Sequence, residues 1–316
     1  GDIERAVKAD KPFFVWFNTT RMHVWTRLSK EAEGKTGKGI YADGLAEHDA
    51  MVGELLAKLD ELKVADNTIV MYSTDNGAQK VSWPDAGISP FRGEKGTSTE
   101  GGHRVPLLVK WPGVIKPDMI SHMHWLPTLA AAAVNDTLKA DLAKGTEIDG
   151  KDYRVHLDGY NYLPYLKGEE KNVPRESYLY FGQAGDLNAI RWNDFKVTFA
   201  ETGGNIMLGT RTVTNWPMIT SLKEDPYETA PYESLMFARW AADMMWIGVP
   251  VRQQLEQFIS TLPNYPMQEG QNMNPAGFNY NTFKAMQMVK QLETVKPLLE
   301  KVKSLSNLTS WGSKGE

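Results

Sequence analysis

Short apolar runs that alternate with amphipathic stretches constrain the fold of this chain more than any other feature. Residues 13–17 (FFVWF) are continuously apolar, as in a strand buried on both faces. Apolar residues then recur at helical spacing over 45–62, and two more strands are expected at 68–73 and 105–110. An alanine-rich helix is expected at 126–134. This order of elements predicts an α/β fold with a doubly wound, mostly parallel sheet.

The pattern changes after a charged break at 168–171. Two short apolar runs flank the turn Asn193-Asp194, which is typical of an antiparallel hairpin, and 218–222 can add a strand. We therefore divide the chain into an α/β unit, residues 1–168, and a small α+β subdomain with an antiparallel sheet, residues 169–316. Further helices are expected at 234–247, 251–261 and 283–305.

Composition excludes several classes of protein. With 41% hydrophobic and 23% charged residues, the chain of 316 residues can build a large core and is not disordered throughout. The net charge of −4 argues against a nucleic-acid partner, and no apolar run approaches the ~20 residues of a membrane span. The absence of cysteine removes disulfides, thiolate nucleophiles and cysteine-ligated metals.

Polar side chains follow the ends of two predicted strands. Asp75 and Asn76 follow the strand at 68–73, where a carboxylate and an amide oxygen suit a hard cation, although Asp-Asn-Gly is also ordinary turn chemistry. His23 follows the first strand and can donate a proton or bind an anion, or it can be a solvated loop histidine. Lys95 lies in a glycine-rich stretch and is either an anion-binding charge or a salt-bridged surface lysine.

These segments, in this order, resemble the type I sulfatases, the arylsulfatase family of the alkaline phosphatase superfamily. The resemblance covers roughly residues 10 to 265. The pieces that carry it are Phe13 to His23, Tyr72-Ser73-Thr74-Asp75-Asn76-Gly77, Pro90 to Pro106, Trp111-Pro112-Gly113, Ser121 to Leu129, Leu157 to Asn161 and Leu222 to Glu228.

The resemblance implies a role for each candidate residue. Asp75 and Asn76 would ligate a divalent cation, Ca²⁺ or alternatively Mg²⁺. Lys95 would bind the sulfate group, and His23 would contact the sulfate ester as a candidate general acid, so both are expected to be catalytic and substrate-binding. The cation and Lys95 would stabilise charge on the sulfuryl oxygens.

One departure from the family affects the expected activity. Family members carry a C/S-x-P-x-R motif whose Cys or Ser becomes formylglycine, the nucleophile. This sequence has no cysteine and no S-x-P-x-R, and the segment from Ser89 to Arg92 has the wrong spacing. We therefore expect the chain to be the C-terminal portion of a sulfatase, with an α/β sheet incomplete at its N-terminus. We also expect it to be inactive alone, with the formylglycine in a preceding segment.

A second departure is His124, which stands where the family usually has Asp and is expected to be structural.

The leading hypothesis is a sulfuric ester hydrolase that acts on a small-molecule sulfate ester or a sulfated sugar. Two alternatives stay open: a phosphodiesterase or phosphonate monoester hydrolase of the same superfamily, and a non-catalytic sulfatase-like protein that binds anionic glycans. The resemblance implies a periplasmic or secreted location, although this sequence contains no signal peptide.

Overall fold

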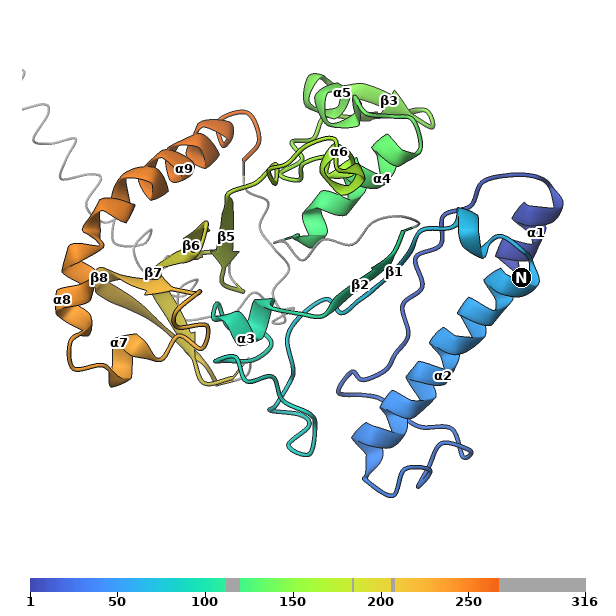
Figure 1. Cartoon of the computed structure of the whole chain (residues 1–316), viewed down its shortest axis with the longest axis horizontal. Coiled ribbons are helices and arrows are strands. Elements are labelled where there is room, and N and C mark those ends of the chain that lie inside the picture. Colours follow the sequence, from blue (N-terminus) through green and yellow to red (C-terminus); the bar gives the residue numbers. More distant parts are fainter. Residues whose placement is uncertain (112–119, 184, 206–207, 267–316) are drawn as a thin grey trace, which may run out of the picture. The chain divides into compact units, whose positions relative to one another are not determined.

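The computed structural model describes residues 1–111, 120–183, 185–205 and 208–266. The described residues of 1–182 and 186–266 group into one compact unit. The strands are β1 (Val70–Ser73), β2 (Leu107–Lys110), β3 (Thr146–Ile148), β4 (Lys151–Tyr153), β5 (Ser177–Phe181), β6 (Leu187–Trp192), β7 (Phe195–Gly203) and β8 (Thr210–Ser221) (Figure 1). The helices are α1 (Asp2–Lys8), α2 (Ile40–Glu61), α3 (Glu100–His103), α4 (Trp125–Ala132), α5 (Leu138–Lys144), α6 (Leu163–Lys167), α7 (Ala230–Glu233), α8 (Phe237–Asp243) and α9 (Gly248–Thr261), with 3₁₀ turns η1 (Ala65–Asn67), η2 (His122–His124) and η3 (Met245–Ile247).

The prediction of a mostly parallel sheet is wrong for the described strands. β1 pairs with β2 in antiparallel register, from Val70 opposite Lys110 to Ser73 opposite Leu107. Parallel neighbours need a long crossover that returns the chain to the same end of the sheet. The connection from β1 to β2 is long enough for such a crossover, but its one helix is the four-residue α3, and the chain returns beside β1 in the opposite direction.

Residues 13–17 do not form the predicted strand. They have no regular secondary structure, and Phe14 is 76% exposed while Trp16 is 81% exposed. A strand buried on both faces needs strands beside it and layers above and below it. Within the described residues this run has no strand as a neighbour, so its apolar side chains face solvent.

The helix predicted at 45–62 is confirmed as α2, which begins earlier, at Ile40. The 3₁₀ turn η1 follows it and leads into β1. The alanine-rich helix is confirmed as α4. The helix predicted at 283–305 lies outside the described residues.

An antiparallel sheet of four strands in the order β5-β6-β7-β8 confirms the predicted hairpin. β6 and β7 turn at Asn193, whose φ of +50° places it in the left-handed region, and Trp192 pairs with Phe195. The strand expected at 218–222 is the end of β8. The domain boundary at residue 168 stays a prediction.

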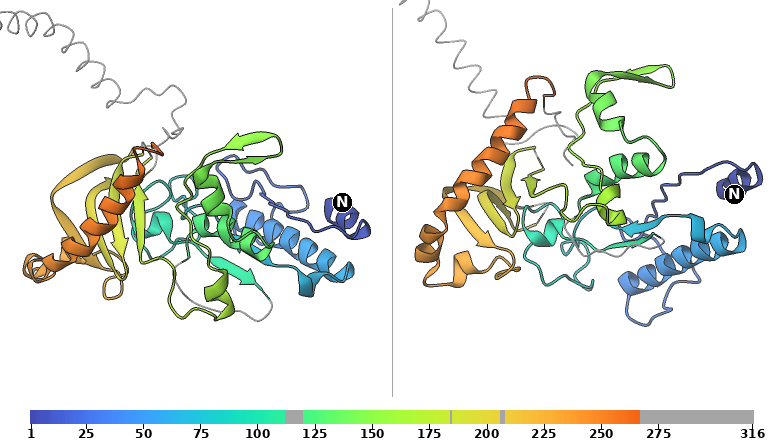
Figure 2. Two further views of the ribbon diagram at one scale, coloured as in Figure 1. Left: turned by 90° about the horizontal axis from the view of Figure 1, so that it is seen from above. Right: turned by 45° about the horizontal axis from the view of Figure 1, so that its top comes forward.

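Helix α9 covers one face of this sheet (Figure 2). Val251 of α9 and Ile247 of η3 pack with Ile190, Val197 and Ile219 of the strands, and all five are at most 5% exposed. Burial of apolar surface at about 25 cal/mol per Å² is the main force that holds helix and sheet together.

A second core lies around α4 and α6, where Trp125, Tyr162, Tyr165 and Leu166 are buried. His124 is buried beside it, with a Tyr162 ring centroid at 4.6 Å. Its surroundings agree with the structural role expected from the sequence.

No described helix is long and apolar enough to cross a membrane.

Candidate functional site

The Asp75-Asn76 pair begins the turn that follows β1, as the sequence predicts. Asp75 is exposed, and its carboxylate lies 3.4 Å from the Thr74 hydroxyl. Asn76 donates from its amide nitrogen to Gly77 O at 2.9 Å, which leaves the amide oxygen as the acceptor of this side chain.

Lys95 occupies the tip of a tight turn. Thr97 N donates to Glu94 O at 3.0 Å, so Lys95 and Gly96 are the central residues of a β-turn. Gly96 has φ of +84°, whereas Lys95 has negative φ, which is the pattern of a type II turn. The Thr97 hydroxyl closes the same turn through Glu94 O at 2.7 Å. The lysine is therefore carried on a backbone of fixed shape.

Two backbone hydrogen bonds join the turn after β1 to the loop that carries Lys95. Lys95 N donates to Ala78 O at 2.9 Å, and Gly77 N donates to Gly102 O at 3.0 Å. The approach is so close that a Cβ on Gly77 would lie 1.7 Å from Gly101 O. The structure therefore brings Lys95 beside the Asp-Asn turn, although the two segments are 20 residues apart.

His23 lies in an exposed loop that packs against α2. The Arg21 guanidinium pairs with Glu47 of this helix at 2.7 Å, and both side chains are at most 14% exposed. Trp83 Nε1 donates to Met22 O at 3.2 Å, which ties the loop to the segment between β1 and Lys95. These contacts hold the backbone on either side of the histidine.

An imidazole links the same loop to β1. His48 Nδ1 lies 2.9 Å from the Thr19 hydroxyl, and His48 Nε2 lies 3.1 Å from the Tyr72 hydroxyl. Tyr72 precedes Asp75 by three residues. The loop of His23 is thus linked to β1 through the His48 side chain, and a shared site for His23 and Asp75 stays a prediction.

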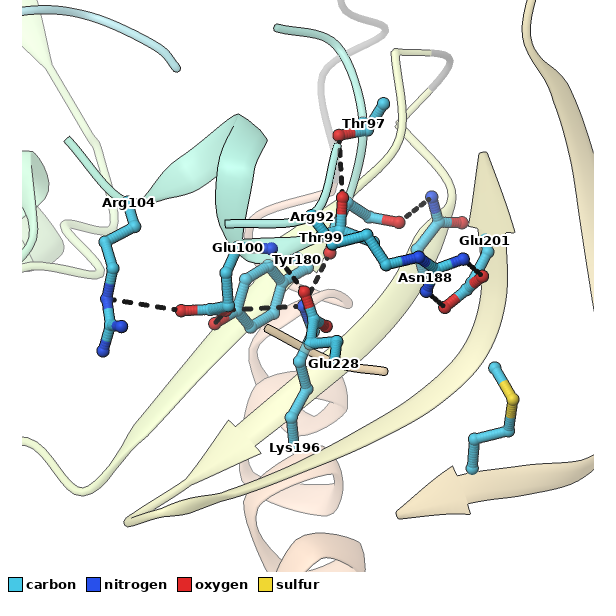
Figure 3. Close-up of polar contacts among 12 residues, drawn as sticks. Arg92, Thr97, Thr99, Glu100, Arg104, Tyr180, Asn188, Lys196, Glu201 and Glu228 are labelled. Carbon is cyan, nitrogen blue, oxygen red and sulfur yellow. Dashed lines mark hydrogen bonds and ion pairs between the residues drawn. The ribbon is translucent and has the colours of Figure 1, made fainter. Parts of the chain in front are cut away.

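One feature of the structure that was not predicted from the sequence is a buried cluster of charged side chains. Lys196 of β7 is fully buried, together with Glu100 of α3 and Glu228 (Figure 3). Lys196 Nζ lies 2.7 Å from Glu228 Oε1 and 3.4 Å from Glu100 Oε1. The one available signal was a lysine between two apolar residues, Phe195 and Val197, near the start of a predicted strand, and the hairpin prediction treated it as an ordinary strand residue.

The cluster shifts the ionisation of its carboxyl groups in opposite directions. Burial alone would raise the pKa of Glu100, but the charge of Lys196 and a hydrogen bond from the Tyr180 hydroxyl lower it below its usual range. Burial raises the pKa of Glu228 in spite of its contact with the same lysine.

Arg92 forms a second tie between the Lys95 loop and the sheet. Its guanidinium donates two hydrogen bonds of 2.9 Å to the Glu201 carboxylate of β7 (Figure 3). The Tyr232 hydroxyl donates to the same carboxylate at 2.6 Å, and the Tyr232 ring lies 4.3 Å from the guanidinium carbon. Paired donors in a planar fork fix orientation as well as distance.

Comparison with known proteins relates this chain to a family. The sequence model of the family described as Sulfatase matches residues 3–135. Human N-acetylgalactosamine-6-sulfatase is 30% identical over 271 residues, which cover 80% of this chain and 50% of that protein. Human arylsulfatase A is 31% identical over 207 residues, which cover 63% of this chain and 38% of that protein. The chain belongs to the sulfatase family.

The fold agrees with this membership. The crystal structure of the PsFucS1 sulfatase from Pseudoalteromonas sp. matches with a TM-score of 0.66 and 24% identity, covering 84% of this chain and 52% of that one. This sulfatase chain spans about half the length, or less, of the curated relatives it matches.

Proposed function

We propose that this chain forms part of the active site of a sulfuric ester hydrolase. The observation that most supports this is the backbone hydrogen bond of 2.9 Å between Lys95 N and Ala78 O. It joins the main chain of Lys95 to the turn that carries the Asp-Asn pair at the end of β1, which supports a shared site for the lysine and the pair. A sulfate group needs positive charge around its oxygens, and a lysine with a cation would supply it from two sides.

The chemistry of Asp75 and Asn76 fits a hard divalent cation, Ca²⁺ or Mg²⁺. One carboxylate and one amide oxygen are oxygen ligands of the kind that both ions take, and the Asn76 amide nitrogen is already used by Gly77 O. Ca²⁺ takes about 6–8 oxygen ligands. Among the described residues no group of three or more His, Asp or Glu side chains is arranged to hold a metal. We infer that further ligands come from residues outside the described part.

Two side chains of this chain would act on the ester. Lys95 would hold the sulfuryl oxygens as charge develops on them, because its ammonium has three donors and no acceptor. His23 would give a proton to the leaving alcohol, since a protonated imidazole can act as a general acid. A bound cation would supply Lewis-acid polarisation of the sulfuryl oxygens.

The nucleophile is expected from outside these 316 residues. The sequence has no cysteine and no S-x-P-x-R motif from which formylglycine could form. We therefore propose that the chain has little turnover by itself. We further infer an alkaline phosphatase-like core in the whole enzyme, in which a parallel sheet is completed beside the exposed run at 13–17.

Relatives named N-acetylgalactosamine-6-sulfatase and arylsulfatase A support a proposal for the substrate class. We propose a sulfated sugar or another small sulfate ester, and a periplasmic or secreted location.

Hydrolysis of p-nitrophenyl sulfate tests the proposal, with bis-p-nitrophenyl phosphate and a phosphonate monoester as competing substrates. The chain alone should turn over the sulfate far below ~1 s⁻¹, the lower end of ordinary enzyme rates. The chain joined to a formylglycine-bearing segment should prefer the sulfate ester. Faster hydrolysis of either phosphorus ester by the joined protein would contradict the proposal, and so would ordinary turnover by the chain alone.

A further inference from the structure

Lys196 reaches from the four-stranded sheet into the loop that carries Lys95. Its ammonium donates to Ser98 O at 2.8 Å and to Glu228 Oε1 at 2.7 Å, with Glu100 Oε1 at 3.4 Å (Figure 3). These three acceptors match the three donors of the group. Two of the three belong to residues that follow Lys95 by three and five positions.

The acceptors are themselves held in place. Glu228 Oε2 accepts a hydrogen bond of 2.6 Å from Glu100 N, so this carboxylate joins the lysine to the loop backbone. The Tyr180 hydroxyl donates to Glu100 Oε1 at 2.7 Å, and the Lys196 ammonium lies 4.1 Å from the Tyr180 ring centroid. Every member of this cluster is at most 3% exposed.

Burial makes this arrangement sensitive to any one member. When one member of a buried ion pair is removed, the remaining charge has neither a partner nor water around it. This costs far more free energy than the loss of a surface ion pair. Removal of the lysine would leave Ser98 O and two carboxylates without their shared donor. The loop from 97 to 102 would then have to move or admit water.

Movement of the segment 97–102 would also move the candidate site, because hydrogen bonds connect the two directly. Thr97 closes the turn that presents Lys95, and Gly102 O accepts the hydrogen bond from Gly77 N beside the Asp-Asn pair. Thr97 and Gly102 both lie in the segment 97–102, which Lys196 contacts at Ser98 and Glu100. Asn188 Nδ2 adds a contact to the Ser98 hydroxyl at 3.2 Å.

We propose that Lys196 is a positioning residue, which holds the 94–102 loop so that Lys95 faces the sulfate group. The role of Lys95 rests on the proposed function above. Lys196 itself touches no substrate, because its three donors are used within the cluster and it is fully buried.

Hydrogen exchange of the 316-residue chain with Lys196→Met tests the anchoring. Amides of 94–102 should exchange at least tenfold faster, while amides of Val197 and Ile219 in the sheet keep most of their protection. Val251→Ala is the matched control, because it removes core volume on the sheet, is 3% exposed in the native chain and is not part of the cluster. That variant should speed exchange across the sheet without singling out the loop. Equal exchange of the loop in the native chain and Lys196→Met would overturn the proposal.

The second readout is the rate of reductive methylation of Lys95 with and without inorganic sulfate, with exposed Lys151 as the internal reference. Sulfate should slow methylation of Lys95 in the native chain and not in Lys196→Met. The same slowing in both would reduce Lys196 to a purely structural residue and overturn the proposal. No slowing even in the native chain would instead count against the sulfate role of Lys95, while hydrogen exchange still decides the anchoring.

Glu228→Gln covers the case in which Lys196→Met does not fold. The amide keeps the shape and can still accept from Glu100 N, but it removes the charge that pairs with Lys196. The loop amides should then exchange several-fold faster, and sulfate should protect Lys95 less. Native exchange and native protection in this variant would contradict the proposal.

Discussion

Single residues matter most where the two loops of the site meet. Gly77 lies so close to the Gly101 backbone that a side chain at position 77 would not fit. The main-chain N–H of Lys95 holds that residue in place by its hydrogen bond to Ala78 O. The identity of Asp75, Asn76 and Lys95 as neighbours could be predicted from their order in a known motif. The closeness of Gly77 to Gly101 could not, because spacing along the sequence does not specify backbone contact.

Gly77→Ala should destabilise the protein and separate the two loops. The added Cβ would lie 1.7 Å from Gly101 O and 2.8 Å from its carbonyl carbon, so backbone must shift. We expect a loss of about 2 kcal/mol or more in the free energy of unfolding by urea, in the range of overpacked sites. Gly53→Ala is the control, because nothing lies within 4 Å of its Cβ position in the middle of α2. That change should stabilise by about 0.5–1 kcal/mol, and similar losses in both variants would contradict this account.

His124 should make stability depend on pH. Burial, together with the charges of Arg175 and Lys139, lowers its pKa to about 3, and Nδ1 accepts a hydrogen bond of 2.9 Å from Tyr160 N. The unfolded chain protonates this histidine below its ordinary pKa of 6.5, whereas the folded chain does not. Its contribution is therefore complete above pH 6.5 and is lost as the pH falls toward 3.

Urea unfolding of the native chain at pH 7 and pH 5 measures this loss. The expected drop from His124 is about 2 kcal/mol. His124→Asn keeps an acceptor for Tyr160 N and should lose that much less between the two pH values. A variant with the same pH dependence as the native chain would show that His124 is protonated in the folded state.

At the scale of elements, periodicity predicted most of what formed. Helix α2, helix α4 and the β6–β7 hairpin follow from local spacing and turn residues. The direction of β1 and β2 did not follow, since pairing depends on the connection between strands and not on the strands themselves. The run at 13–17 was mispredicted for a similar reason, because an apolar segment forms a strand only where other strands lie beside it to pair with it.

The exposed run should make the chain associate. Phe14, Trp16 and Phe17 are between 54% and 81% exposed, and contiguous apolar surface of this kind promotes self-association. The average mass by light scattering should rise above 35.5 kDa with concentration, and the double change Phe14→Lys and Trp16→Lys should reverse most of that rise. Trp216→Lys on β8 is the control, because this tryptophan is 71% exposed and lies outside the run. If Trp216→Lys lowers the average mass as much as the double change does, association comes from surface hydrophobicity in general and not from the run at 13–17.

At the scale of the whole molecule, the site depends on segments far apart in the sequence. The loop at 94–102 is joined to the β1 turn by backbone bonds and to the β5–β8 sheet by Lys196 and Arg92. A motif could predict the loop but not the residues that hold it, because Lys196 lies 98 positions from its acceptor Ser98. The second half of the chain thus supports a candidate site to which the first half contributes Asp75, Asn76, Lys95 and His23.

The role of Lys95 in binding sulfate is the central claim, and steady-state hydrolysis of p-nitrophenyl sulfate by the chain joined to a formylglycine-bearing segment tests it most directly. Lys95→Ala should lower kcat/KM by about 10²–10³-fold, as for the loss of one preorganised donor to a developing charge. Lys151→Ala, which removes an exposed lysine of β4, should leave kcat/KM unchanged. A folded Lys95→Ala protein with the native kcat/KM would contradict the account.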